Sequence, residues 1–212
     1  MRILRMISGA ALALLLLTEA TALNASAAAP TAPKLSAEDK AQISRIEKYL
    51  DTIRSLRADF LQIDSAGGIA KGKVYLKKPG RMRFEYAPPA KLLVVADGVW
   101  LVFRDNELKE TTRLPLYSTP VSVLLEDKTD FSEDVRVTKV EHEANVLRLT
   151  VIDPDNPDEG NIVLIFSDKP LQLRQWLVTD AQGNVTSISL GNVETNLKLK
   201  PELFTFFDSD YE

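Results

Sequence analysis

The chain has 212 residues, of which 26 are Lys or Arg and 30 are Asp or Glu, and it contains one histidine, His142, and no cysteine. The absence of cysteine excludes disulfide bonds, thiolate metal sites, a cysteine nucleophile and acylation of a cysteine of this chain. A single histidine argues against Ser-His-Asp catalysis, and the net charge of −4 does not favour a nucleic-acid partner. We therefore expect a binding protein, not an enzyme, with no metal and no cofactor.

The first residues have the pattern of a secretory signal. Two arginines precede an apolar stretch, residues 6–17, that is too short to span a bilayer as a helix. Small residues follow, and Ala25-Ser26-Ala27 is an A-x-A cleavage site, with Ala20-Thr21-Ala22 as the alternative. We predict a signal peptide over 1–27, a flexible tether over 28–35 and a single domain over 36–212.

An amphipathic helix is predicted directly after the tether. Ser36 is a typical N-cap, and Glu38 and Asp39 place acidic groups in the first helical turn. Apolar residues then recur at steps of three and four, which predicts a helix of about 20 residues with one apolar stripe. The stripe consists of Ile43, Ile46, Leu50, Ile53 and Leu56.

From Arg57 onward the apolar period changes to two, which predicts strands. Pro79-Gly80 and Asp97-Gly98 are the clearest turn signals between them. No connection is long enough for a crossover helix, so we expect one antiparallel sheet that curves to hide its edges. The expected strands lie near residues 57–64, 71–77, 81–86, 91–96, 99–104, 107–113, 134–141, 146–152, 161–167, 171–179 and 184–193.

Two segments interrupt this succession of strands. Thr119-Pro120 before the apolar residues 121–125 predicts a short central helix, with Thr119 as its cap, that lies on the sheet. The acidic segment 153–160 could be a calcium loop or a solvated hairpin tip. Its two prolines and the spacing of its carboxylates favour the hairpin tip.

Large apolar side chains alternate along three neighbouring runs of the predicted sheet. Such residues either fill a core or line a cavity, and periodicity alone does not separate the two. Two helices are too little to fill a barrel of about eleven strands, which favours a cavity. The residues that share a face within their own run are Met82, Phe84 and Tyr86, then Leu93 and Val95, then Leu101 and Phe103.

Six cations lie within residues 71–83, around the Pro79-Gly80 turn. They are either the solvated face of a strand pair or a docking patch for an acidic protein or anionic lipid headgroups.

Six segments of the predicted domain together form a recognisable pattern: 58–62 (ADFLQ), 72–86 (GKVYLKKPGRMRFEY), 95–98 (VADG), 119–125 (TPVSVLL), 176–183 (WLVTDAQG) and 204–206 (FTF). Through these motifs, the chain resembles the periplasmic outer-membrane lipoprotein carriers of the LolA family. The resemblance covers nearly all of the predicted domain and keeps the family's order.

This resemblance implies a mainly β fold with a helical lid. The expected architecture is an incomplete, strongly curved antiparallel barrel of about eleven strands, covered by the N-terminal helix and the short central helix. The protein would be a periplasmic chaperone and a monomer. It would take triacylated lipoproteins from an inner-membrane ABC transporter and hand them to an outer-membrane acceptor protein or to the membrane.

Two classes of alternative remain beside this interpretation. The first is a free-lipid carrier or a lipoprotein-sensing module of the same fold. The second is a small secreted hydrolase that uses paired carboxylates such as Asp153 and Asp155, for which the sequence offers no nucleophile.

The resemblance also assigns roles to residues. The family usually has Arg before the Pro-Gly turn as a latch on the lid; here Lys78 keeps the charge but lacks the planar guanidinium, and Arg81 or Arg83 is the alternative. The expected cavity lining is Met82, Phe84, Tyr86, Leu93, Val95, Leu101, Phe103 and Trp176. The expected lid residues are Leu50, Ile53, Pro120, Val121, Leu124 and Leu125. The expected docking patch is Lys71, Lys73, Lys77, Arg81 and Arg83.

Overall fold

The structure is a computed structural model that describes residues 34–131 and 135–207. The predicted signal peptide, residues 1–27, lies outside the described residues, and so does the predicted tether except for Lys34 and Leu35. No helix in the described part of the chain is long and apolar enough to cross a membrane.

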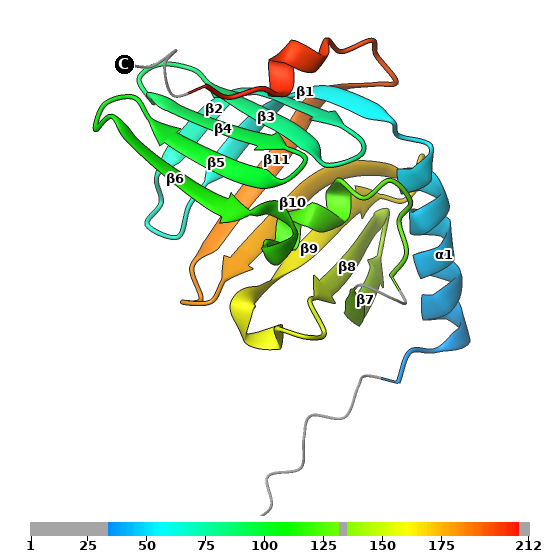
Figure 1. Cartoon of the computed structure of the whole chain (residues 1–212). Coiled ribbons are helices and arrows are strands. Elements are labelled where there is room, and N and C mark those ends of the chain that lie inside the picture. Colours follow the sequence, from blue (N-terminus) through cyan, green and yellow to red (C-terminus); the bar gives the residue numbers. More distant parts are fainter. Residues whose placement is uncertain (1–33, 132–134, 208–212) are drawn as a thin grey trace, which may run out of the picture. The chain divides into compact units, whose positions relative to one another are not determined.

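The described chain is built on one eleven-stranded sheet in which each neighbouring pair is antiparallel (Figure 1). The strand order is β6-β5-β4-β3-β2-β1-β11-β10-β9-β8-β7, so the first and last strands pair and the sheet remains open at β6 and β7. The predicted fold class, a curved and incomplete antiparallel barrel, is therefore confirmed. The strands are β1 (Ser55–Ile63), β2 (Ile69–Lys77), β3 (Arg81–Tyr86), β4 (Leu92–Asp97), β5 (Trp100–Asp105), β6 (Glu110–Pro115), β7 (Arg136–Glu143), β8 (Val146–Ile152), β9 (Gly160–Ser167), β10 (Gln172–Asp180) and β11 (Val185–Thr195).

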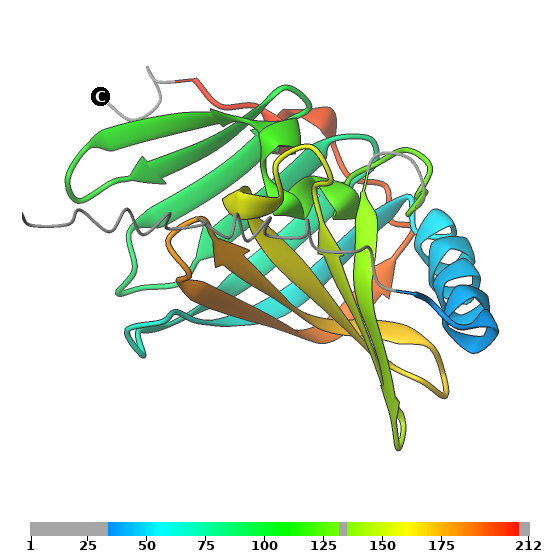
Figure 2. The same cartoon turned by 90° about the horizontal axis from the view of Figure 1, so that it is seen from below.

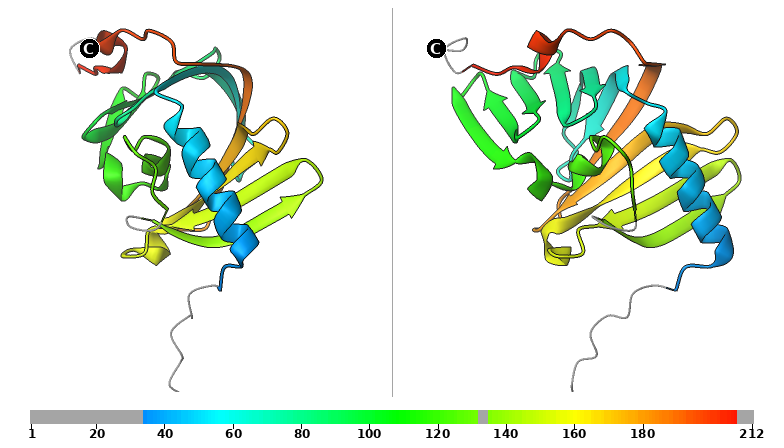
Figure 3. Two further views of the ribbon diagram at one scale, coloured as in Figure 1. Left: turned by 90° about the vertical axis from the view of Figure 1, so that its right-hand side faces the viewer. Right: turned by 45° about the vertical axis from the view of Figure 1, so that its right-hand side comes forward.

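The N-terminal helix α1 (Ala37–Asp51) begins as predicted and ends earlier. Ser36 caps it, because the Asp39 backbone N–H donates to Ser36 Oγ at 3.0 Å while the Ser36 N–H donates to Asp39 Oδ2 at 2.8 Å. The helix stops at Asp51 because Ser55 already pairs with Lys77 in the sheet. Figure 3 shows α1 crossing in front of the strands, and it contacts β7.

The predicted central helix corresponds to the 3₁₀ helix η2 (Pro120–Leu124) between β6 and β7. A second 3₁₀ helix that was not predicted, η1 (Leu116–Ser118), precedes it. Thr119 does not cap η2 as expected; its hydroxyl donates to the Leu116 carbonyl at 2.6 Å. Figure 2 shows this segment lying between the two halves of the curved sheet. Two further 3₁₀ helices are η3 (Pro157–Glu159) and η4 (Pro201–Phe204).

Apolar side chains are buried on both faces of the sheet. The main core lies on the concave face, where α1 and η2 pack against the strands. On the convex face, η4 contacts β3 and β4, and Phe204 is only 2 % exposed. The Arg83 Nη1 group donates to the Leu203 carbonyl at 3.3 Å, and the Arg113 guanidinium lies 5.6 Å from the centre of the Phe206 ring. The segment after β11 therefore covers part of the outer face.

Candidate functional site

The concave face holds an apolar cavity of about 640 Å³. It lies between strands β3–β6 and strands β10–β11, and the segment Ser118–Val121 forms one wall. Its lining is mostly apolar, which fits a ligand without charge. Its large apolar side chains are Met82, Phe84, Tyr86, Leu92, Leu93, Leu101, Phe103, Leu114, Trp176 and Ile188.

Aromatic rings form the inner wall of this cavity. The Phe84 ring packs edge-on against Phe60, with ring centres 4.9 Å apart, and against Trp176, with ring centres 6.3 Å apart. Gly72 makes room for this arrangement, because a Cβ atom at that position would lie 1.9 Å from the Glu85 carbonyl oxygen and 2.9 Å from the Phe60 ring. The strand pairing places Gly72 directly between Phe60 and Tyr86.

The buried hydroxyl group of Tyr86, in the aromatic wall, has a hydrogen-bond partner. The Tyr86 hydroxyl donates to Gln62 Oε1 at 2.7 Å, and burial raises the pKa of Tyr86 to about 12. The phenol therefore stays neutral throughout the physiological range. Charged side chains such as Arg104, Asp105 and Asp180 also line the cavity, at the ends of their strands.

The structure places seven of the eight predicted lining residues along this cavity, all except Val95. The prediction for Val95 is wrong, because this residue pairs with Arg83 and Val102 on the opposite face and is fully buried there. Alternation makes Val94, the partner of Phe84, the residue that faces the cavity. Leu93 shares the face of Val95 but still reaches the cavity edge.

The predicted lid residues divide into two groups. Pro120 and Val121 line the cavity directly. The other four, Leu50, Ile53, Leu124 and Leu125, are buried in the main core and do not line it. The cover over the cavity in this structure is therefore the η1–η2 segment, while α1 fills the neighbouring part of the concave face.

Lys78 lies where three segments of the chain meet. Its side chain is 8 % exposed, and Nζ donates to the Leu50 carbonyl at 3.2 Å and to Thr129 Oγ1 at 3.1 Å. It thus joins the end of α1 to the chain that follows η2. Burial lowers the pKa of Lys78, and the nearby Asp51 carboxylate opposes that effect.

The alternative latch residue Arg83 does not reach the cover. It pairs with Glu85 at 2.7 Å and donates to the Leu203 carbonyl on the convex face. The strand register also places Arg81 opposite Lys77 and Asp97, on the face of the sheet that carries Arg83.

The predicted docking patch is a surface of mixed charge. Lys73 pairs with Asp59 at 3.1 Å, and Lys77 donates to the Leu199 carbonyl at 3.2 Å. Lys71 is exposed beside them on β2. Two of the five cations in the predicted patch, Lys73 and Arg83, are therefore paired with carboxylates of the chain.

Sequence reasoning did not identify Gln62, Val178 and Ile188 as lining residues, although each lies along the cavity. The sequence pattern could have identified two of them. Gln62 lies two residues after Phe60 and Val178 lies two residues after Trp176, so each shares a face of its strand with that aromatic residue.

Residues 51–207 match the model of a family described as outer membrane lipoprotein carrier protein LolA. This match covers well over half of the chain. The chain belongs to the LolA family. The family is one of carriers, not of enzymes.

Relatives with this description cover most of the chain at low identity. The outer-membrane lipoprotein carrier protein of Methylococcus capsulatus is 27 % identical over 172 residues, which is 77 % of this chain and 82 % of the relative. That of Chromobacterium violaceum is 28 % identical over 187 residues, which is 84 % of this chain and 90 % of the relative. The crystal structure of a LolA superfamily protein from Nitrosomonas europaea superposes with a TM-score of 0.46 and 12 % identity, covering 77 % of this chain and 97 % of that one.

All the cavity-lining residues lie within the part of the chain that matches the LolA family. Lys78 and the η1–η2 segment lie within it as well, whereas α1 precedes it except for Asp51.

Proposed function

We propose that this LolA-family protein is a periplasmic chaperone that holds the acyl chains of lipoproteins in the concave cavity and carries them from the inner to the outer membrane. The observation that supports this proposal is the apolar cavity of about 640 Å³ under a short, separate cover segment. The donor would be an inner-membrane ABC transporter, and the recipient an outer-membrane acceptor protein or the membrane itself. The carrier would act as a monomer.

The free energy of an acyl chain in water explains why such a carrier is needed. At about 0.8 kcal/mol per CH₂ group, a chain of roughly 16 carbons costs about 13 kcal/mol to expose. Because one lipoprotein carries three such chains, it cannot diffuse freely through water from one membrane to the other. The sequence contains no nucleotide-binding motif, so we infer that the protein accepts and releases this cargo by differences in affinity.

We expect the cavity to enlarge when cargo binds. A methylene group takes up about as much volume as a water molecule in the liquid, roughly 30 Å³, so a chain of about 16 carbons needs nearly 500 Å³. Three such chains need roughly 1,500 Å³. This exceeds the observed cavity of about 640 Å³, so we expect the η1–η2 cover to move away from β3–β6 when they bind.

Lys78 is suited to act as the latch of this cover. Its ammonium group bonds to α1 on one side and to Thr129, five residues beyond η2, on the other. The neighbouring turn adds a backbone bond, because the Gly80 N–H donates to the Leu125 carbonyl at 2.8 Å. Displacing the cover breaks these bonds, which sets a cost for opening.

The test is binding of a triacylated lipopeptide to the purified protein, compared with binding of a phospholipid. We expect the lipopeptide to bind and Phe103→Glu to weaken it by about tenfold or more, since the change removes apolar contact worth roughly 2 kcal/mol. Phe103 lines the cavity and is 39 % exposed, so the folded protein tolerates a charge there.

Trp100→Glu is the matched control. Trp100 lies on the same strand, is 43 % exposed and belongs to the opposite face. Equal loss of affinity in both variants would refute the cavity as the binding site. Binding of phospholipid in place of the lipopeptide would favour the free-lipid carrier.

A further inference from the structure

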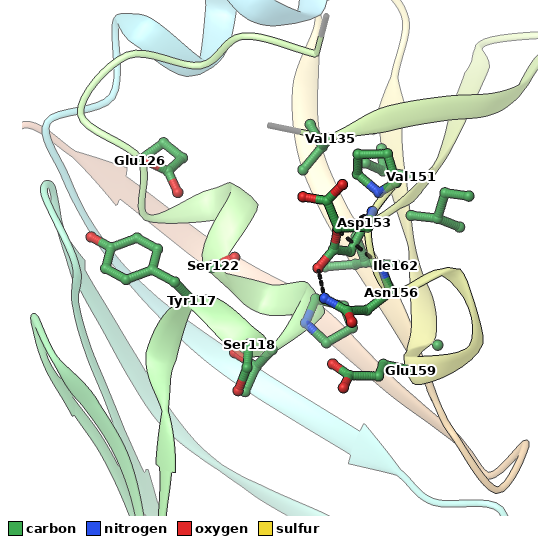
Figure 4. A pocket seen from close by; sticks show the side chains of 16 residues that line it. Tyr117, Ser118, Ser122, Glu126, Val135, Val151, Asp153, Asn156, Glu159 and Ile162 are labelled. Carbon is green, nitrogen blue, oxygen red and sulfur yellow. Dashed lines mark hydrogen bonds between the residues drawn. The ribbon is translucent and has the colours of Figure 1, made fainter. Parts of the chain in front are cut away.

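A second cavity lies on the other side of the η1–η2 segment. It is a groove of about 440 Å³ between this segment and the connection from β8 to β9 (Figure 4). Tyr117, Ser118 and Ser122 stand on one wall, and Asp153 and Asn156 on the other. We refer to it as the side groove.

The side groove adjoins the apolar cavity. Four residues line both spaces: Ser118, Thr119, Pro120 and Glu159. A molecule whose apolar part fills the cavity could therefore continue past Pro120 into the side groove without crossing the sheet.

The lining of the side groove differs from that of the cavity. Its apolar part is contributed by Val135, Val151 and Ile162, and hydroxyl, amide and carboxylate groups surround it. Among the described residues that line it, none is Lys or Arg, while the carboxylates are Glu126, Asp153, Asp155 and Glu159.

One of these carboxylates is held in place by its own loop. Asp153 accepts hydrogen bonds from the Asp155 N–H at 2.8 Å and from Asn156 Nδ2 at 3.1 Å. The bond from Asn156 holds the pKa of Asp153 below its ordinary value, so this group is ionised at neutral pH. The side groove therefore has a negative wall of fixed geometry.

We propose that the side groove binds the polypeptide that follows the acylated residue of the cargo, and that it favours peptides carrying Lys or Arg. This inference rests on the proposed function, because acyl chains in the cavity are covalently attached to the start of a polypeptide that must leave it. The two spaces adjoin at Ser118–Pro120, where the polypeptide would leave the cavity, and the polar lining can bond to an extended main chain. The cavity would then supply affinity, and the side groove would select among cargo peptides.

The experiment uses synthetic peptides that share a triacylated N-terminal cysteine and differ in the residues that follow. One carries serine and a run of lysines, a second serine and a run of glutamates, and a third serine and a run of glutamines. We expect the full-length protein at low ionic strength to bind the lysine peptide about fivefold more tightly than the glutamate peptide, the effect of two or three exposed charge pairs.

The decisive variant is the double substitution Glu126→Gln with Asp155→Asn, which removes two charges from the side groove at residues that do not line the apolar cavity. It should bring the ratio of the two dissociation constants close to one and leave binding of the glutamine peptide unchanged. The control is Glu143→Gln with Glu202→Gln, which removes two exposed charges outside the side groove.

The possible outcomes separate the two hypotheses. If none of the three lipopeptides binds, the proposed carrier function fails. If all three bind equally well, or if the control variant lowers the ratio as much as the side-groove variant, the carrier function stands and the peptide groove is refuted.

Discussion

The latch hypothesis predicts a specific effect of Lys78→Met. Methionine keeps the apolar stem of the side chain and removes the ammonium group that bonds to the Leu50 carbonyl and to Thr129 Oγ1. The substitution therefore releases the chain after η2 from α1 without leaving a large void.

The magnitude follows from two opposing effects. Each hydrogen bond to a charged group contributes about 1.5 kcal/mol at the low end of its range, so two bonds give about 3 kcal/mol. Burial of the ammonium group costs free energy, as the lowered pKa of Lys78 shows, and the methionine variant does not have this cost. The second effect therefore offsets part of the first. A net loss of about 1–2 kcal/mol corresponds to a five- to thirtyfold rise in the population of the released state.

Hydrogen exchange measures this release directly. The Thr129 N–H donates to Asp51 Oδ1 at 2.8 Å, and the Phe131 N–H donates to Glu47 Oε1 at 3.1 Å, so both amides are protected only while the segment lies on α1. We expect both to exchange five to thirty times faster in Lys78→Met, while amides at the centre of β8 and β9 keep their rates.

The adjacent lysine provides the control for this measurement. Lys77 Nζ donates to the Leu199 carbonyl at 3.2 Å and has no bond to the cover, so Lys77→Met should leave the Thr129 and Phe131 amides unchanged. Unaltered exchange of these amides in Lys78→Met would refute the latch. A uniform acceleration that includes β8 and β9 would show a loss of global stability instead.

Two further predictions concern stability. Phe204→Ala should lower the free energy of unfolding in urea by about 3 kcal/mol, because a nearly fully buried ring is lost from the convex face; a loss below about 1 kcal/mol would show that this segment contributes little. Asp168→Asn should lower the melting temperature at pH 7 and have less effect at pH 3. Hydrogen bonding to Arg45, and to a smaller extent to His142, lowers the pKa of the Asp168 carboxyl in the folded protein. The ionised carboxylate therefore stabilises the fold above its unfolded pKa of about 4, and this stabilisation is lost as the pH falls through the lower folded pKa. An equal effect of Asp168→Asn at both pH values would contradict this assignment.

Most of the fold could be predicted because each strand is bounded by local turn chemistry. Gly80, at a φ of +70°, and Gly98, at a φ of +109°, adopt the left-handed conformation that the turns require, and both turns were predicted from Pro79-Gly80 and Asp97-Gly98. The end of α1 was not predictable in the same way. Ile53 and Leu56 keep the helical spacing, but the sheet register takes over at Ser55, and that register depends on residues far away in the sequence.

The candidate site shows a different limit of sequence reasoning. The alternation of residues along a strand shows which of them share a face, and it correctly grouped Leu93 with Val95. It does not show which face of the sheet is concave. In β4 both faces are buried, because the segment around Phe204 covers the outer one. The usual contrast between a polar and an apolar face is therefore lost, and only the pairing of Phe84 with Val94 identifies the inner residue.

If the cavity holds acyl chains as proposed, the exposure of its lining would allow one site both to bind and to release them. If the cavity of about 640 Å³ were a closed void in a packed core, it would cost roughly 15 kcal/mol at about 24 cal/mol per Å³, more than a domain of this size can bear. The structure avoids that cost because lining residues such as Phe103 and Leu114, 39 % and 41 % exposed, remain in contact with water. Under the proposed function, an acyl chain would gain affinity by covering this exposed apolar surface and would lose part of that gain by displacing the η1–η2 cover. The bonds of Lys78 would then lower the affinity of the carrier for its cargo, and a recipient that needs no such opening could take the cargo without an energy source.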